Sequence, residues 1–164
     1  MRQDPLWRPT LEQAASSEMA RFRNFFGEKL GVAIPDYPAL HKASVDERGS
    51  FWSALWDYCG VIGEKGNRFL GEDRMPGAQF FPNARLNYAE NLLRDADDRE
   101  AIVFRAEDRV ERRLTRRELL KAVGKAQRFL VSKGIGVGDR VAAMLPNCPE
   151  AIVMMLATAS IGAI

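Results

Sequence analysis

Residues 136–164 close the chain with the stretch GVGDRVAAMLPNCPEAIVMMLATASIGAI, and this stretch decides the fold. Residues 140–145 form a short apolar run that predicts a β-strand, and residues 151–164 are apolar on nearly every helical face. A helix of that kind must be covered on all sides, by more protein than the preceding residues can supply. We therefore expect the sequence to be part of a larger chain.

The caps around this helix and the helix before it follow recognisable patterns. Asn147 and Glu150 predict a cap for the last helix, and Pro149 fits its first turn, where a missing N–H costs nothing. Thr115 and Glu118 form a Thr-x-x-Glu capping box that opens a long helix. The predicted buried face of that helix consists of Leu119, Val123, Ala126 and Leu130, and Gly134 is its predicted end.

Residues 101–105 and 109–114 predict two strands of an antiparallel hairpin, with residues 106–108 as its turn. The order strand, helix, strand, helix then predicts an α/β fold with a parallel layered sheet and right-handed crossovers.

The first half of the chain predicts helices instead. Thr10 and Gln13 fit a capping box, and a helix should run from there to Gly31. Residues 32–42 contain two prolines and predict an extended connector, and residues 45–62 predict a second helix with a packed aromatic face. Residues 63–77 predict a loop, and a short helix follows with one apolar face: Leu86, Ala89, Leu92 and Leu93.

The polar run 95–100 is the predicted domain boundary. We expect a helical N-terminal extension over residues 1–95 and the start of a second domain over residues 96–164.

Composition excludes several classes of protein. The chain has 24 Lys and Arg against 22 Asp and Glu, a balance that does not predict binding to nucleic acid or an anionic membrane. Cys59 and Cys148 lie far apart, so we interpret both as packing residues in a reducing compartment. The N-terminus has no apolar signal segment, and the longest apolar run is too short to span a bilayer. The cytoplasm is the expected location.

No catalytic constellation is present. Gly134, Gly136 and Gly138 resemble a dinucleotide loop, but a predicted strand follows them, so a tight helix-to-strand turn is favoured. There is no P-loop motif, His41 is the only histidine, and one His with two distant Cys offers no metal-binding set. Asp97 with its neighbour Asp98 could act as paired carboxylates, although a solvated turn is favoured.

A cluster of arginines is the one electrostatic anomaly: Arg105, Arg109, Arg112, Arg113, Arg116 and Arg117. Such a cluster can bind phosphates. Acidic residues alternate with it, however (Glu107, Asp108, Glu111 and Glu118), so a salt-bridged hairpin edge is the favoured interpretation.

Four motifs in order, FWSALWDYCGV, FFPNARLNYAENLL, LTRREL and the terminal stretch quoted above, resemble the N-terminal part of the acetoacetyl-CoA synthetases. These belong to the acyl-adenylate-forming, or AMP-binding, superfamily. Residues 114–119 resemble its first core motif, with Arg116 where an aromatic residue is frequent, and residues 156–164 resemble the opening of the second.

The resemblance implies an ATP-dependent ligase that joins acetoacetate to coenzyme A with Mg²⁺, through an acyl-adenylate, and a role in ketone body utilisation and lipid metabolism. The helical extension should pack its aromatic faces on the adenylating domain: Phe22, Phe26, Trp52 and Trp56. No residue here matches a catalytic, cofactor-binding or metal motif, so we expect this segment alone to be inactive and to bind none of ATP, CoA and Mg²⁺. It should expose an apolar patch around Ile152, Met155 and Ile161.

Two alternatives remain open. The parent could be an acetyl- or propionyl-CoA synthetase, since acyl specificity would be set elsewhere. The segment could also be a non-catalytic module in which the arginine-rich hairpin binds a protein or RNA.

Overall fold

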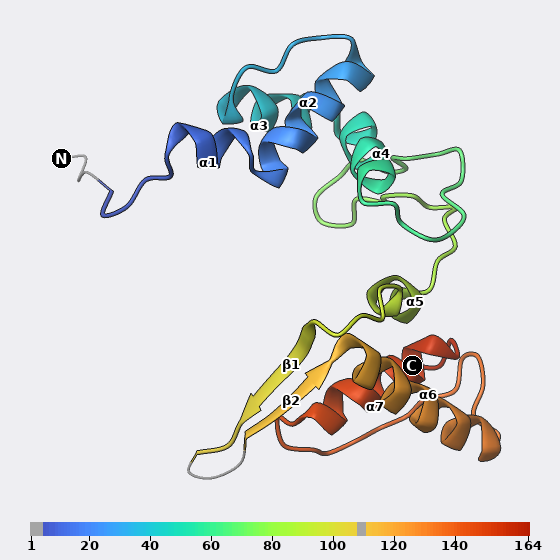
Figure 1. Cartoon of the computed structure of the whole chain (residues 1–164). Helices are drawn as coiled ribbons and strands as arrows, with labels where there is room; N and C mark the ends of the chain where they lie inside the picture. Colours follow the sequence, from blue (N-terminus) through green and yellow to red (C-terminus); the bar gives the residue numbers. More distant parts are fainter. Residues whose placement is uncertain (1–4, 108–110) are drawn as a thin grey trace. The chain divides into compact units, whose positions relative to one another are not determined.

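The computed structural model describes residues 5–107 and 111–164, which fall into two compact units, Met1–Arg85 and Leu86–Ile164 (Figure 1). The predicted strand residues Arg109 and Val110, and Asp108 of the predicted turn, lie outside the described residues. Each unit has its own hydrophobic core. None of the helices in the described ranges combines the length and the hydropathy that a membrane span requires.

The first unit consists of four helices followed by a long loop: α1 (Leu11–Ala15), α2 (Glu18–Leu30), α3 (Tyr37–Asp46) and α4 (Arg48–Tyr58). Its core is aromatic, as Phe26 is fully buried and its ring lies parallel to that of Phe22 at 6.0 Å. Phe51 of α4 meets both rings edge-on, at 5.4 and 5.5 Å, and Tyr58 meets Phe22 in the same way. Phe22 and Phe26 are therefore covered by their own unit.

The predicted helix from Thr10 to Gly31 is two helices. The capping box of Thr10 and Gln13 is present, but α1 ends at Ala15 and the Ser17 hydroxyl caps a new helix by accepting from the Ala20 N–H at 3.2 Å. Serine oxygens satisfy the unpaired N–H groups of a helix start, so a Ser-Ser pair favours this break. Gly31 ends α2 as predicted, in the left-handed conformation with φ of 68°.

The prediction of an extended connector over residues 32–42 was wrong, because α3 begins at Tyr37. Asp36 caps this helix by accepting a hydrogen bond from the Ala39 N–H at 2.9 Å. Pro38 lies in the first turn, where the N–H that proline lacks would have no partner. The two prolines thus precede and begin a helix instead of preventing one.

The second predicted helix, 45–62, is shorter than expected and spans Arg48–Tyr58. Its aromatic side chains contact other rings of the first unit: Trp52 meets Phe80 at 5.6 Å, and Trp56 meets Phe81 at 5.1 Å. Packing of Trp52 and Trp56 on the adenylating domain stays a prediction. Cys59 lies beyond the helix and is exposed, so its interpretation as a packing residue was wrong. The predicted loop 63–77 contains no helix or regular strand, only isolated bridges that pair Glu64 with Arg85 and Leu70 with Phe80.

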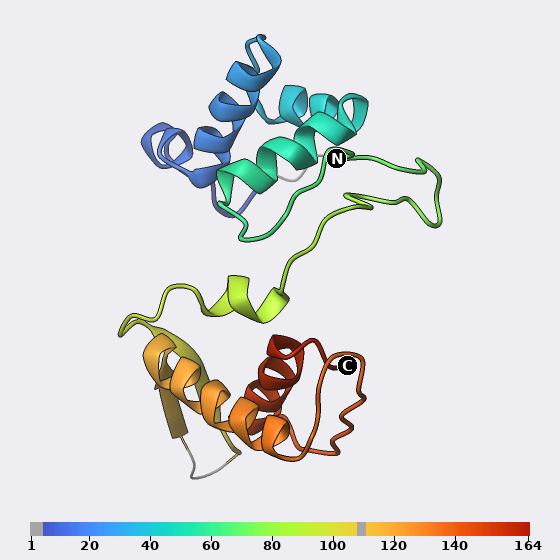
Figure 2. The same ribbon diagram turned by 90° about the vertical axis from the view of Figure 1, so that its right-hand side faces the viewer.

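The second unit contains α5 (Tyr88–Leu93), β1 (Glu100–Arg105), β2 (Glu111–Thr115), α6 (Arg116–Ser132) and α7 (Pro149–Ser160). Strands β1 and β2 form the predicted antiparallel hairpin, with Ile102 opposite Leu114. Helices α6 and α7 pack side by side next to this hairpin (Figures 1 and 2). Their shared core is apolar and consists of Ala89, Leu119, Val123, Leu130, Leu156 and Ala157.

Helix α6 forms as the sequence predicts. Both hydrogen bonds of the Thr115 and Glu118 capping box are present. Leu119, Val123 and Leu130 are buried and Ala126 packs against them. Gly134 follows the helix with φ of 80°, the left-handed conformation that suits glycine.

Residues 140–145 do not form a regular strand, and the only sheet among residues 5–107 and 111–164 is the two-stranded antiparallel hairpin. The predicted parallel layered sheet is therefore not seen in this part of the chain. A strand needs a neighbour that pairs with it, and among the described residues the backbone around the start of this segment bonds only to residues 162–164 beyond its own turn.

The predicted cap of the last helix was also wrong. Cys148 occupies the cap position of α7 without a side-chain hydrogen bond, although Pro149 begins the helix as expected. The Glu150 carboxylate instead accepts a hydrogen bond from the Arg112 guanidinium at 2.7 Å. A hydrogen bond between two charged groups is stronger than one between neutral groups, and this one joins β2 to the first turn of α7.

Helix α5 is shorter than its apolar pattern predicts, because Leu86 precedes it and Leu92 is exposed, while Ala89 and Leu93 pack inward. It packs on α7, so the compact second unit starts ten residues before residue 96. The division into an extension, 1–95, and an adenylation domain, 96–164, stays a prediction, since compactness does not tell which function each part serves.

Replacing Phe26 by alanine should lower the free energy of unfolding of the first unit by about 3–5 kcal/mol, because a fully buried ring leaves a cavity. Urea unfolding followed by tryptophan fluorescence reports on this unit, since all three tryptophans, Trp7, Trp52 and Trp56, lie in it. Leu11→Ala is the control: Leu11 is 91% exposed, so its midpoint should stay close to that of the parent chain. Equal midpoints for the two variants would contradict this assignment of the core.

The Thr115 cap should make part of the stability of α6 depend on pH. Hydrogen bonds from the backbone and side chain of Thr115 hold the pKa of Glu118 below its usual value. Because the folded pKa is the lower one, this stabilisation is present above the unfolded pKa and is lost as pH falls through the folded pKa. Thr115→Ala should destabilise the helix by about 1 kcal/mol, and NMR titration should show the pKa of Glu118 rising.

Thr10→Ala is the matched control for this experiment, because its capping box uses Gln13, which does not titrate. Its destabilisation should not change between pH 7 and acid. Alanine keeps the backbone N–H of residue 115, so a pKa of Glu118 unchanged in Thr115→Ala would show that the Thr115 hydroxyl does not contribute to the shift.

Candidate functional site

The histidine and the two cysteines are not grouped at one site within either compact unit. His41 lies exposed on α3 of the first unit, with its ring 6.4 Å from that of Tyr37. Cys148 is partly buried at the start of α7 in the second unit. Within the described parts of the chain, no group of three or more His, Cys, Asp or Glu side chains could hold a metal ion. We therefore assign no Mg²⁺ ligand to this segment.

The glycine-rich turn after α6 has the geometry of a chain reversal. Gly134 and Gly138 have φ of 80° and 83°, and the Gly136 N–H donates to the Asp139 carboxylate at 2.8 Å. The turn follows a helix and leads into the extended segment 139–145. A phosphate-binding loop needs its N–H groups at the start of a helix. The prediction of a helix-to-strand turn is confirmed as a turn, although no regular strand follows.

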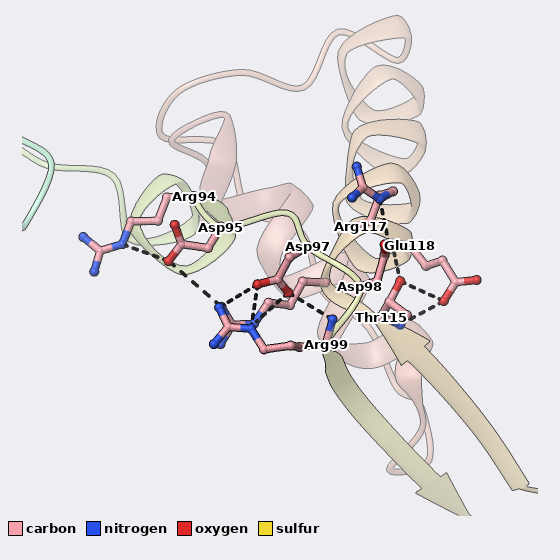
Figure 3. A network of polar contacts seen from close by, with 9 residues as sticks. Arg94, Asp95, Asp97, Asp98, Arg99, Thr115, Arg117 and Glu118 are labelled. Atoms are coloured by element: carbon pink, nitrogen blue, oxygen red, sulfur yellow. Dashed lines mark hydrogen bonds and ion pairs between the residues drawn. The ribbon is translucent and has the colours of Figure 1, made fainter.

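Asp97 and Asp98 are engaged by arginines instead of by each other (Figure 3). Asp97 accepts hydrogen bonds from the Arg99 side chain at 2.6 Å and from the Arg99 N–H at 3.0 Å. The Arg99 side chain holds the pKa of Asp97 below its usual value. Asp98 accepts from Arg117 at 2.9 Å, which joins the segment before β1 to the first turn of α6. Each carboxylate is bound by its own arginine and not by the other carboxylate, so the favoured interpretation as a solvated turn fits the structure.

The arginine cluster is occupied by acidic partners. Arg113 donates to Glu100 at 2.6 Å and to Glu111 at 2.8 Å, and these bonds raise the pKa of the guanidinium. The remaining described members also form ion pairs: Arg105 with Glu111, Arg112 with Glu150, Arg116 with Asp95 and Asp97, and Arg117 with Asp98. Arg109 and Asp108 lie outside the described residues. The described arginines therefore form a salt-bridged surface. Their ion pairs connect the hairpin and the start of α6 with α7 and with the segment before β1.

Asn87 is a residue that the sequence analysis missed. Its side-chain oxygen caps α5 by accepting from the Glu90 N–H at 3.1 Å. Its side-chain nitrogen donates to the carbonyls of Ala159, at 2.9 Å, and of Ser160, at 3.3 Å. An asparagine directly before a helix signals a cap, but no sequence pattern shows that the same side chain holds the end of a helix 72 residues later.

An apolar groove of about 450 Å³ lies between α7 and residues 141–145 in the second unit. The exposed apolar surface next to it is formed by Met144, Leu145, Met155 and Ile164. Met155 is exposed as predicted, whereas Ile152 and Ile161 are partly buried against the core. The exposed part of the predicted patch is thus Met155, because α6 and α5 pack against other faces of this helix.

Two family models match the chain, one for the acetyl-coenzyme A synthetase N-terminus over residues 37–92 and one for AMP-binding enzymes over residues 89–164. The acetoacetyl-coenzyme A synthetase of Rhizobium meliloti is 54% identical over 98% of this chain. A malonamoyl-CoA synthetase of Penicillium aethiopicum is 35% identical over 97% of it. The chain spans only 25% and 23% of the length of these two relatives.

A solved structure of the acetoacetyl-CoA synthetase from Streptomyces lividans has the same fold over 99% of this chain and 26% of its own, with a TM-score of 0.86 and 39% sequence identity. The match therefore extends over both compact units. The chain belongs to the AMP-binding enzyme family, and in sequence and fold it corresponds to the N-terminal quarter of its acetoacetyl-CoA synthetases.

Proposed function

We propose that this segment is the N-terminal part of an ATP-dependent acetoacetate:CoA ligase and serves that enzyme as scaffold. The parent would convert acetoacetate, ATP and CoA into acetoacetyl-CoA, AMP and diphosphate, with Mg²⁺ as the metal. The observation that carries this proposal is the 54% identity to an acetoacetyl-coenzyme A synthetase over 98% of the chain. A role in ketone body utilisation and a cytoplasmic location form part of the same proposal.

The described residues support a scaffold role over a catalytic one. The acidic and basic side chains around the hairpin are paired with one another, and we assign to this segment no catalytic residue and no cofactor. Activation of a carboxylate by ATP requires groups positioned to stabilise the charge that develops on the phosphates. We propose that those groups lie in other parts of the parent, and that residues 1–164 alone bind none of ATP, CoA and Mg²⁺.

Acetoacetate is the proposed acid, although this chain is also similar to a segment of the malonamoyl-CoA synthetase. That relative is named for a different acid but shares 35% identity with this chain, against 54% for the acetoacetyl-coenzyme A synthetase. A shared scaffold with different named acids fits a specificity pocket outside this segment. Acetate and propionate remain the alternative substrates of the parent.

The parent enzyme should catalyse ATP–pyrophosphate exchange that depends on acetoacetate, at a rate about tenfold or more above that with acetate or propionate. A pocket that hydrogen-bonds the second carbonyl leaves its polar groups unpaired when the shorter acids bind, which produces discrimination of this order or greater. Exchange with acetate but not with acetoacetate would overturn the substrate assignment.

Residues 1–164 alone should give no exchange above the background without enzyme, with any of the three acids. Isothermal titration of this segment with ATP and with CoA should likewise give no heat of binding. Exchange activity in the isolated segment would contradict the proposal that it is scaffold only.

A further inference from the structure

The loop 63–85 of the first unit folds back on itself and is closed by its own hydrogen bonds. At its two ends, the Glu64 N–H donates to the Arg85 carbonyl and the Arg85 N–H donates to the Glu64 carbonyl, both at 2.8 Å. Further along, the Gly71 N–H donates to the Gln79 carbonyl at 2.7 Å. The loop therefore has two limbs that run antiparallel and are bonded to each other.

Two glycines allow these limbs to approach closely. A Cβ atom at Gly66 would lie 3.1 Å from the Cβ of Asn83 on the other limb, and one at Gly71 would lie 3.1 Å from the Cβ of Gln79. Carbon atoms pack at about 3.5–4.0 Å, so a larger residue at either position would push the limbs apart. The sequence thus builds this loop as a compact element without regular secondary structure.

Lys65 joins the loop to α4. Its ammonium donates to the Ser53 carbonyl at 2.8 Å and to the Asp57 carboxylate at 2.7 Å. It also lies 5.0 Å from the centroid of the Phe69 ring, within the range of a cation–π interaction. The Lys65 side chain is only 20% exposed, so water and salt screen these contacts less than they screen a surface ion pair.

Two further contacts between the loop and α4 are more exposed. Arg48 forms an ion pair with Asp73, and their side chains are 41% and 40% exposed. The rings of Trp52 and Phe80 meet at 5.6 Å, and both residues are 40% exposed. Exposed ion pairs contribute little free energy, so we expect Lys65 to be the polar contact that holds the loop most firmly.

The buried core of the first unit comes from residues that precede this loop: Phe22, Phe26, Ile34, Leu40 and Ala54. The partly buried apolar side chains packed against that core lie between Phe25 and Tyr58. The loop contacts Trp52 and Trp56 of α4 instead. Separation of the loop from α4 would therefore leave the buried core in place.

We propose that the loop 63–85 opens as one cooperative unit while the four helices stay folded, and that Lys65 is the residue that holds it closed. Opening breaks the bonds of Lys65 to Ser53 and Asp57 and exposes the aromatic side chains of α4. A two-stranded arrangement of this size is marginal in water on its own, so the bonds between the limbs are lost once the loop separates. The inference goes beyond the proposed function, because it concerns a motion of the first unit and holds whichever acid the parent activates.

Amide hydrogen exchange measured by NMR on residues 1–164 tests the opening. The amides of Glu64, Gly71 and Arg85 should exchange with one common free energy of opening, because all three depend on the same event. That free energy should be lower than the one for the Phe26 amide in α2, whose exchange requires the helical core to open.

Lys65→Met tests the role of the ammonium, because methionine keeps an unbranched apolar side chain and removes the charge. Exchange of the three loop amides should become about tenfold or more faster, since a hydrogen bond to a charged group contributes free energy of that order. The Phe26 amide should exchange as in the parent chain, which also verifies that the variant keeps its helical core.

Lys42→Met is the matched control. Lys42 forms an ion pair with Asp46 on the surface of α3, and its side chain is 77% exposed. Loss of such a pair has little effect on stability. The three loop amides should therefore exchange in this variant as they do in the parent chain.

Three results would overturn the proposal. The loop amides could exchange with unrelated free energies of opening, or they could exchange only together with Phe26, which would make the loop part of the helical core. Lys65→Met could also leave their exchange unchanged. None of these measurements depends on ATP–pyrophosphate exchange by the parent, so the opening of the loop and the proposed activity can fail separately.

Discussion

The need to cover α7 is the constraint on which the second unit depends. Of its twelve residues only Glu150 is charged, so water is an unfavourable neighbour on almost every face. Leu156 and Ala157 are fully buried, and α6 meets them with Leu119, Val123 and Leu130. Helix α5 contributes Ala89 to the same core. What these elements leave uncovered is the groove beside residues 141–145.

Polar contacts orient the elements around this apolar core more than they stabilise it. Exposed ion pairs such as that of Arg117 with Asp98 contribute little free energy each, because water and salt screen them. They do join particular segments: Arg117 ties the chain before β1 to α6, and Arg112 of β2 reaches Glu150 of α7. Asn87 does the same for α5 and the end of α7. The arginines of the hairpin and of the first turn of α6 therefore form ion pairs within the second unit.

Similarity to the acetoacetyl-CoA synthetases covers both units, although each has a separate core. In the first unit the core is made by stacked and edge-on rings, which are large apolar groups with preferred mutual geometries. In the second it is made by aliphatic residues of two long helices. The proposed role of this segment is to build the fold around which the chemistry takes place.

The sequence by itself determined the features that depend on near neighbours in the chain. Helix α6, with its capping box and its buried leucines and valine, and the hairpin before it could be predicted because their signals lie within a few residues. That no catalytic residue lies in this segment stays a prediction from residue types and spacing.

Contacts between distant residues were decided only by the tertiary structure. Residues 140–145 have the composition of a strand, yet a strand requires a partner, and within the described ranges only Ile164 forms a backbone hydrogen bond with this segment. Glu150 could have capped α7, but Arg112, 38 residues earlier, binds its carboxylate. Asn87 holds a helix end 72 residues away. These hydrogen bonds form because the fold brings residues that are distant in the sequence within hydrogen-bond distance. The sequence around each residue does not indicate which distant groups will come that close.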